Sequence, residues 1–452
     1  MNDRREIFGW MMYDWANSAF STTVAGALLM PYLTSLAQAD VGDNGVVLSL
    51  GPLGALTVKS FFSICTAVSV ILQALFLPIL GALADYSDLK KRLLAAFCYL
   101  GATATCLLFF ITGDLYRLGA YLFIVANLSF GASIVMYNAF LREICSADQT
   151  DKVSSRGYAM GYLGGGILLA LNFLLLLSAP ALGITAGLAV RISLLSAGLW
   201  WAGFAIITFV RLKSRTIAKP LSKGHTLLTI GFSELRQTFG ELARLPQTLR
   251  FLIAYLLYND GVQTVILQAS LFLSQELFTV SQRNAGEDVS FVLKLFLMIQ
   301  FVAFFGALLF ERIAALAGTK KAILISLVLW AGVVVYAYRF LHTTTQALGM
   351  GVVIAIVLGG SQALSRSLFA RMIPAGFEAS FFGLYEVSER GTSWIGPSLF
   401  GLVAGSTGSF RQAILSVIVL FVAGIIILAL TDTDRAIRDA SRSVATGATD
   451  RL

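Results

Sequence analysis

The sequence predicts an all-α integral membrane protein with twelve transmembrane helices in two pseudo-symmetric six-helix bundles. Of its 452 residues, 57% are hydrophobic and only 13% are charged, against the roughly 25% charged residues of a typical soluble domain. The mean hydropathy is +0.80, and apolar runs of about 20 residues recur along the chain, which is the length of a helix that crosses a bilayer. A surface this apolar requires lipid as its solvent.

Twelve apolar runs with few charges are long enough to cross a membrane. In chain order we expect helices at residues 14–37, 58–84, 93–113, 118–141, 157–178, 190–210, 250–275, 290–310, 321–339, 346–369, 380–404 and 411–431. The longest polar stretch, 211–249, is predicted to be a cytoplasmic linker between the bundles 1–210 and 250–431. Residues 432–452 are predicted to form a polar cytoplasmic tail, which need not be ordered.

The distribution of basic residues predicts the orientation. Most of the 33 Lys and Arg residues lie in alternate loops and in both terminal segments. Positive residues mark the cytoplasmic side, so we expect a multi-pass protein of the inner cell membrane with both termini in the cytoplasm. Because the net charge of +8 is spread between apolar segments and not gathered on one patch, nucleic acid is not expected as a partner.

The few potential ligand side chains show no pattern of a metal or redox site. The four cysteines and two histidines have no paired spacing, so neither a metal, a cofactor nor a disulfide framework is expected. The glycines include no phosphate-binding loop ahead of Lys and Ser or Thr, which leaves ATP-driven pumping without support. Five glycines of the fifth predicted helix, from Gly157 to Gly166, are expected to let helices pack closely in lipid.

The two halves of the chain resemble each other. Phe140–Ile144 ends the fourth predicted helix and Phe369–Ile373 ends the tenth, while Gly81–Leu83 ends the second and Gly306–Leu308 ends the eighth. The spacing between the paired segments is nearly equal and their order is the same, which indicates a duplicated six-helix unit. Many secondary transporters build a substrate site between two such repeats at the bilayer midplane.

The segment Gly81–Arg92 resembles the loop signature of the major facilitator superfamily. It has a glycine, then Asp85 four residues later, then a basic run at its end, and it departs from the common pattern at Tyr86 and Asp88. The resemblance implies a gate on the cytoplasmic side. For this role we expect Gly81, Asp85, Lys90, Lys91, Arg92 and Arg142, with Asp85 pairing with a basic residue such as Arg142 in one state only.

Four further segments are similar to the vacuole-effluxer-like branch of that superfamily. They are Gly9–Ser18, Tyr258–Gly261, Gly359–Arg366 and Phe381–Tyr385. The resemblance extends from about residue 5 to residue 430. Eukaryotic members of this branch are associated with amino-acid efflux from the vacuole, so the resemblance implies a transporter without identifying its cargo.

Ionisable and amide side chains within the predicted helices are the candidates for substrate binding or proton coupling, because such groups are costly in a membrane unless they face a cavity or a partner. The candidates are Asp14, Asn17, Asp260, Gln263, Gln362, Arg366, Glu386, Glu389 and Arg390. Asp14 either caps a helix at the interface or faces the cavity with Asn17. Asp260 is either a proton carrier or a structural partner.

Arg366 follows Gln362 by one helical turn, and its guanidinium suits a carboxylate of the substrate or of another helix. The second option is a salt bridge to Glu386 or Glu389. Those two glutamates and Arg390 are spaced to share one helical face, with one carboxylate left over. They form either a structural ion-pair cluster or a proton relay.

Together these observations predict a secondary active transporter, not an enzyme, that moves a small solute by alternating access. An amino acid or similar zwitterion would leave fewer buried charges unpaired than a neutral sugar, and the carboxylates suggest proton coupling. We expect a monomer whose partners are the small-molecule substrate, protons and the lipid bilayer. The alternative is a transporter-like membrane sensor or a lipid-handling protein.

Overall fold

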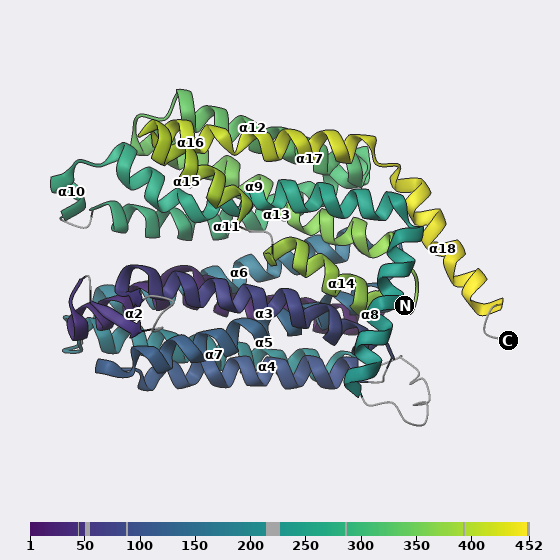
Figure 1. The fold of residues 1–452 in the computed structure, drawn as a ribbon, viewed down its shortest axis with the longest axis horizontal. Coiled ribbons are helices and arrows are strands. Elements are labelled where there is room, and N and C mark those ends of the chain that lie inside the picture. The colour runs from purple at the N-terminus through teal and green to yellow at the C-terminus, as the bar shows by residue number, and fades with distance from the viewer. Residues whose placement is uncertain are drawn as a thin grey trace.

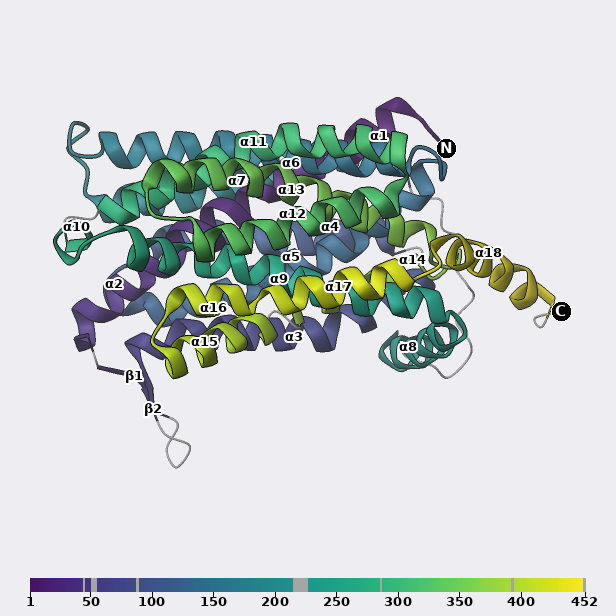
Figure 2. The same cartoon turned by 90° about the horizontal axis from the view of Figure 1, so that it is seen from above.

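The structure is a computed structural model that describes all residues except 44, 50–54, 87–88, 214–226, 285–286, 392–393 and 450–452; some helical side chains, including that of Arg390, also lie outside the described part. The helices run along one long axis, and both termini lie at the same end of it (Figures 1 and 2). We call this the termini end. The opposite end carries the short helix α10 (Val280–Asn284) and the antiparallel hairpin of β1 (Val46–Ser49) and β2 (Ala55–Thr57).

The first half of the chain folds into long helical rods that occupy one side of the molecule (Figure 1). The first rod is continuous from α1 through a π-helical segment, η1, into α2. In order the elements are α1 (Arg4–Ala19), η1 (Phe20–Leu28), α2 (Leu29–Val41), α3 (Val58–Tyr86), α4 (Lys90–Leu107), the 3-10 turns η3 (Leu108–Phe110) and η4 (Gly113–Leu115), α5 (Tyr116–Ile144), α6 (Thr150–Ser178) and α7 (Ala186–Arg211).

The second half occupies the other side, and its eleventh predicted helix is broken. The elements are α8 (Leu227–Arg244), α9 (Pro246–Leu277), α10, α11 (Glu287–Ala317), α12 (Thr319–Arg339), α13 (Thr344–Arg371), α14 (Glu378–Glu386), the π-helical segment η5 (Val387–Gly391), α15 (Ile395–Thr407), α16 (Phe410–Ser416), α17 (Ile418–Leu430) and α18 (Thr433–Thr449).

The predicted all-α membrane fold is confirmed, whereas the predicted number of twelve spans is not. Ten helical segments among the described residues are long and apolar enough to cross a membrane, by length and composition. Of the two other predicted helices, α9 is 32 residues long but carries polar side chains at Asn259, Asp260 and Gln263. The prediction of one continuous helix at 380–404 is wrong, because α14, η5 and α15 divide that stretch.

Several helices extend beyond their predicted ends at the termini end. The first begins at Arg4 and not at residue 14, and the fifth begins at Thr150 and not at residue 157. The prediction stopped at charged side chains, whereas the helix continues through them until its capping residues, such as Asp3, which accepts from the Arg5 backbone N–H. The predicted linker likewise contains a helix, α8, and the predicted tail contains α18.

Glycines allow the helices to approach closely, as expected for α6. A Cβ added at Gly157, Gly161 or Gly164 would lie within 2.9 Å of atoms of Asp14, Ser18 or Trp15, so these positions hold α6 against α1. The same α6 also packs against α11 and α13 of the second half. One helix thereby joins the two halves.

A second contact between the halves joins α3 to α14. A Cβ at Gly81 would lie 2.2 Å from the backbone oxygen of Ala379, and one at Gly383 would lie 2.9 Å from the backbone oxygen of Leu77. Only glycine at these positions permits the two backbones to meet. The gate glycine of the sequence motif is therefore a packing residue between the halves in this state.

We predict that Gly81→Ala destabilises this state by about 1–3 kcal/mol, because the added methyl group overpacks the contact between α3 and α14. The measurement is the apparent melting temperature of the purified protein in detergent. Gly203→Ala in α7 is the matched control, since no atom of the described residues lies within 4 Å of a Cβ there. Equal melting temperatures for the two variants would contradict the prediction.

Candidate functional site

A cavity of about 480 Å³ lies between the two halves. Its lining along α13 runs from Ala347, near the opposite end, to Arg366, and its lining along α1 begins at Asp14. The cavity therefore extends from a floor at Asp14 and Arg366 toward the end that carries α10, and the packed contacts at Gly81 and Gly383 lie on the termini side of that floor.

The two walls of the cavity differ in polarity. The wall from α1, η1, α5 and α6 carries many hydrogen-bonding side chains, among them Asn17, Ser18, Thr22, Asn138 and Tyr162. The wall from α9, α11 and α13 is mostly apolar above the floor, with Phe272, Leu273, Leu295, Phe296 and Met350 among its residues. The cavity can thus offer polar contacts on one side and apolar contacts on the other.

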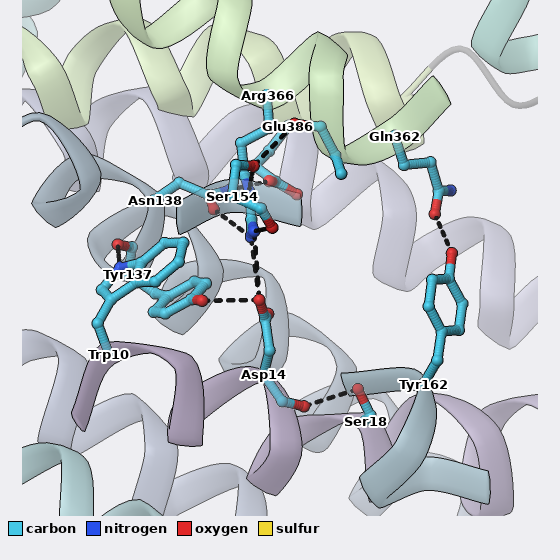
Figure 3. A network of polar contacts seen from close by, with 11 residues as sticks. Trp10, Asp14, Ser18, Tyr137, Asn138, Ser154, Tyr162, Gln362, Arg366 and Glu386 are labelled. Atoms are coloured by element: carbon cyan, nitrogen blue, oxygen red, sulfur yellow. Dashed lines mark hydrogen bonds and ion pairs between the residues drawn. The ribbon is translucent and has the colours of Figure 1, made fainter. Parts of the chain in front are cut away.

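An ion pair between the halves forms the floor (Figure 3). Arg366 of α13 donates from Nη1 and Nη2 to Oδ2 of Asp14 in α1, each at 3.3 Å. Arg366 is 2% exposed and Asp14 is 7% exposed. Asp14 is therefore a buried floor residue and not an interfacial cap. The structure thus pairs Arg366 with a carboxylate of another helix, which is one of the options that the sequence left open, and this carboxylate is Asp14 of α1.

Four further hydrogen bonds satisfy the ion pair. Tyr137 donates its hydroxyl to Asp14 Oδ2 at 2.7 Å, while Arg366 donates from Nε to Ser154 Oγ and from Nη2 to the Ser154 backbone oxygen, both at 2.9 Å. Arg366 Nη1 also donates to Asn138 Oδ1 at 3.3 Å. A buried charge is tolerated only with partners of this kind.

Three aromatic rings enclose the guanidinium. The Arg366 Cζ atom lies 4.2 Å from the centre of the Tyr158 ring, 4.9 Å from that of Trp10 and 5.5 Å from that of Tyr137. The Trp10 and Tyr137 rings stack at 4.3 Å, and Trp10 Nε1 donates to the Tyr137 backbone oxygen. Cation–π contacts add to the stabilisation of a desolvated cation, and the rings fix its position.

Glu386 is linked to the same network through an amide. Asn138 Nδ2 donates to Glu386 Oε1 at 3.0 Å, and Glu386 is fully buried within the protein while also lining the cavity. Glu389 lines the cavity as well. Glu389 and Arg390 belong to the π-helical segment η5, and the side chain of Arg390 lies outside the described part, so the predicted shared face of Glu386, Glu389 and Arg390 stays a prediction.

The three amide candidates, Asn17, Gln263 and Gln362, all line the cavity. Gln362 accepts from the Tyr162 hydroxyl at 3.0 Å, which joins α13 to α6 above the floor (Figure 3). Asn17 and Gln263 both line the cavity. The Asn17 Nδ2 atom is buried and has no hydrogen-bond partner among the described residues, so it is a donor available to a solute.

Asp260 is placed differently from the other candidates. It is 1% exposed, is absent from the described cavity lining, and accepts from the backbone N–H of Gly396 at 2.5 Å, next to the first turn of α15. A carboxylate there is favoured by the partial positive charge of the helix N-terminus. Its other oxygen, Oδ1, is buried without a partner in the described part of the chain.

Asp85 binds the N-terminus of α14 across the junction of the two halves. Its oxygens accept from the backbone N–H groups of Ala379 and Ser380 at 2.9 and 2.7 Å, and from the Ser380 hydroxyl at 2.8 Å. Lys90 Nζ lies 3.8 Å from Asp85 and 2.5 Å from Glu143. The expected pairing of Asp85 with Arg142 is not formed in this structure, because these donors take its place.

The remaining gate candidates have separate surroundings. Lys91 donates to the backbone oxygen of Leu212 at 2.6 Å, where it neutralises the C-terminal end of α7. Arg92 is exposed. The Arg142 Nη1 atom is buried and has no hydrogen-bond partner among the residues that the structure describes.

A second polar junction closes the termini end on the other side, and sequence reasoning missed it. Asp151, in the first turn of α6, accepts from Thr319 Oγ1 at 2.6 Å, from Arg371 Nη2 at 3.2 Å and from Ser367 Oγ. Arg156 pairs with Glu311 nearby at 3.3 Å. Arg371 was visible in the sequence as the repeat counterpart of Arg142, and that correspondence was the signal that could have found this junction.

The network residues Tyr137, Asn138 and Ser154 were also missed. Asn138 could have been found as a lone amide near the end of an apolar helix, but Tyr137 and Ser154 carry no signal in one sequence, since both are common in membrane helices. No group of three or more His, Cys, Asp or Glu side chains within the described residues could hold a metal ion.

Comparison with known proteins decides the family. The family model described as vacuole effluxer Atg22 like matches residues 2–441. The chain belongs to this family. It is 30% identical over 431 residues to the uncharacterized MFS-type transporter YxiO of Bacillus subtilis, covering 94% of this chain and 95% of that protein. It is 25% identical to autophagy-related protein 22-1 of Penicillium rubens, and this alignment covers 98% of this chain and 92% of that protein.

Solved structures agree on the fold. The transporter FucP of the major facilitator superfamily, in the outward conformation, superposes with a TM-score of 0.67 at 12% identity, covering 95% of this chain and 98% of that one. The human organic anion transporter MFSD10 superposes with a TM-score of 0.66 at 15% identity, and the superposition covers 94% of this chain and 99% of that one. The chain is thus a multi-pass membrane transporter of this superfamily and not an enzyme, and the sensor or lipid-handling alternative is not favoured.

We predict that Asp14→Asn or Arg366→Gln alone lowers stability by about 3–5 kcal/mol, since each leaves a buried charge without its partner. The double variant should lose less than the sum, because both charges are gone. Thermal unfolding in detergent measures this cycle. The pair of an exposed Arg435 and a half-buried Asp439 on α18 serves as the control, with little expected effect of Asp439→Asn. Strict additivity at the floor would show that the two residues do not interact.

Proposed function

We propose that this transporter moves a small solute by alternating access between two six-helix bundles, 1–210 and 250–431. In this proposal α9 and the broken segment α14–η5–α15 supply the two spans beyond the ten that are apolar throughout. The main support is the Asp14–Arg366 pair, because it joins the two halves beneath a cavity. Separating the halves at the termini end requires breaking it.

The cargo we propose is an amino acid or a similar zwitterion. A solute with one carboxylate and one ammonium group can enter the floor by exchange: its carboxylate replaces Asp14 beside Arg366, and its ammonium group then neutralises Asp14. No buried charge is left unpaired in that exchange, which avoids a cost of several kcal/mol. The amide of Asn17 and the apolar wall would hold the remainder of the solute.

We further propose that protons drive the cycle and that Glu386 carries them. It lines the cavity, so water can deliver a proton, and it contacts the network through Asn138. Asp260 is the weaker candidate, since it lies away from the described lining and caps α15. Glu389 remains a candidate for the same role, and Arg390 a candidate for pairing with one of the two glutamates.

The gate belongs to the same proposal. Gly81, Asp85, Lys90, Lys91, Arg92 and Arg142 lie at the termini end, which we place in the cytoplasm of a cell with the protein in its inner membrane. The bonds from Ala379 and Ser380 to Asp85 exist only while α3 and α14 touch. They would break when this end opens, and a single copy of the chain contains all of these parts.

The variant Arg366→Lys tests whether the cargo carries a carboxylate. Lys keeps the charge but loses the planar fork that binds a carboxylate with two hydrogen bonds. We expect binding of amino acids to weaken at least tenfold, while binding of amines that lack the carboxylate changes little; thermal shift or calorimetry on the purified protein measures both. Uniform loss across both ligand classes, or preference of the unmutated protein for uncharged sugars, would reject the zwitterion.

Glu386→Gln tests the coupling. In proteoliposomes with an imposed pH gradient, the variant should lose accumulation of cargo against its gradient and keep downhill exchange, because only the titrating group is removed. Asp260→Asn should keep accumulation if it is structural. Asp288→Asn in α11 is the control, being another buried carboxylate that binds Ser274 outside the network. Accumulation by Glu386→Gln at the unmutated rate would exclude Glu386 as the proton carrier.

A further inference from the structure

The hydrogen bonds at the cavity floor form one continuous chain that crosses between the halves three times. Glu386 of α14 accepts from Asn138 of α5, Asn138 accepts from Arg366 of α13, and Arg366 donates to Asp14 of α1. α14 and α13 belong to the second half, whereas α5 and α1 belong to the first. Every bond in the chain is therefore a contact between the halves.

The Asn138 amide has only one orientation that satisfies both neighbours. The guanidinium of Arg366 is a donor without any acceptor, so the atom that faces it must be the carbonyl oxygen Oδ1. The amide nitrogen then faces Glu386 and donates to Oε1 at 3.0 Å. An ionised Glu386 makes this bond charge-assisted, which is about twice as strong as a bond between neutral groups. A negative Glu386 thus holds the amide with its oxygen toward Arg366.

We propose that Asn138 is a positioning residue that transmits the protonation state of Glu386 to the Asp14–Arg366 pair. This inference rests on the proposed proton coupling, and it adds the route by which protonation of Glu386 reaches the ion pair. When Glu386 takes a proton from cavity water, it loses its charge and gains an O–H donor, so the bond from Asn138 weakens and the amide is free to turn. Arg366 then loses an acceptor, and two of the bonds that join the halves at the floor are released together.

Other titratable groups surround Glu386, and of those in the described part of the chain only Arg366 also bonds directly to Asn138, at the amide oxygen. On the cavity side these are Asp14, Arg366, Tyr158 and Glu389, which share its lining. Toward the termini end, Asp85 of α3 is bonded to the first turn of α14, and Glu378 of that turn accepts from the Gly376 backbone N–H. Arg142 lies one turn beyond Asn138 on α5. The variant Glu389→Gln therefore tests whether this second cavity carboxylate, and not Glu386, produces the response to pH.

The test needs no cargo, because a change of pH alone should change the distance between the two halves at the termini end. Spin labels are placed on exposed sites at the termini end of each half, Ala147→Cys before α6 and Lys321→Cys in α12, after the four native cysteines are replaced by alanine. Pulsed electron spin resonance then gives the distance between the labels in lipid nanodiscs from acidic to alkaline pH. In the parent we expect the mean distance to grow by several ångström as the pH falls, and in Glu386→Gln to stay constant.

Asn138→Leu should abolish the pH response of the distance although Glu386 is still present, and Asn138→Gln, which keeps an amide, should retain a response with a shifted midpoint. Asn172→Leu is the matched control, since this buried Asn of α6 contacts Ser196 and not the floor. If Asn138→Leu does not fold, a midpoint in Asn138→Gln identical to that of the parent would itself overturn the proposal.

The outcomes separate this proposal from the one on which it rests. A parent that shows no pH response, or a response that Glu386→Gln leaves intact, would overturn proton coupling through Glu386 and the relay with it. A parent response that Glu386→Gln removes and Asn138→Leu preserves would overturn the relay alone.

Discussion

Burial of Arg366 is the constraint on which the rest of the site depends. A guanidinium remains charged in any protein environment, so it cannot escape the cost of desolvation by losing a proton. In this chain the cost is offset by Asp14, by Ser154 and Asn138, and by three aromatic rings. Every one of these groups comes from α1, α5 or α6, whereas Arg366 itself comes from α13. The cation can therefore be satisfied only while the two halves of the protein meet at the cavity floor.

The two junctions on the termini side of the floor extend this closure with related chemistry. At one, the carboxylate of Asp85 in the first half binds the first turn of α14 in the second. At the other, Asp151 in the first turn of α6 binds Thr319 and Arg371 of the second half. At both junctions the N-terminal turn of one helix, α14 or α6, binds a side chain of the opposite half. Such a correspondence is expected of a duplicated unit. The cavity is left on the far side of the floor, and FucP in its outward conformation has a similar fold.

Hydropathy and helical length were enough to predict the membrane fold and ten of its spans, because each depends on composition over about 20 residues. The division of the eleventh predicted helix into α14, η5 and α15 was not predictable in that way, since a short π-helical segment changes no hydropathy average. The cost of charge in a membrane selected Asp14, Arg366 and Glu386, and all three line the cavity. It could not pair them, because pairing depends on how α1 and α13 are placed in space, and for Asp260 it left a proton carrier and a structural partner both open.

In the proposed cycle, the Asp14–Arg366 pair keeps the termini end closed. The most direct test is the accessibility of Ser18→Cys, which lies one turn above Asp14 in the cavity lining, to a membrane-impermeant maleimide applied to either face of oriented proteoliposomes. We expect labelling from the face opposite the termini alone in the parent. When Asp14→Asn and Arg366→Gln are combined, we expect labelling from the termini face as well. Unchanged labelling from the opposite face alone in that double variant would contradict the proposed role of the pair.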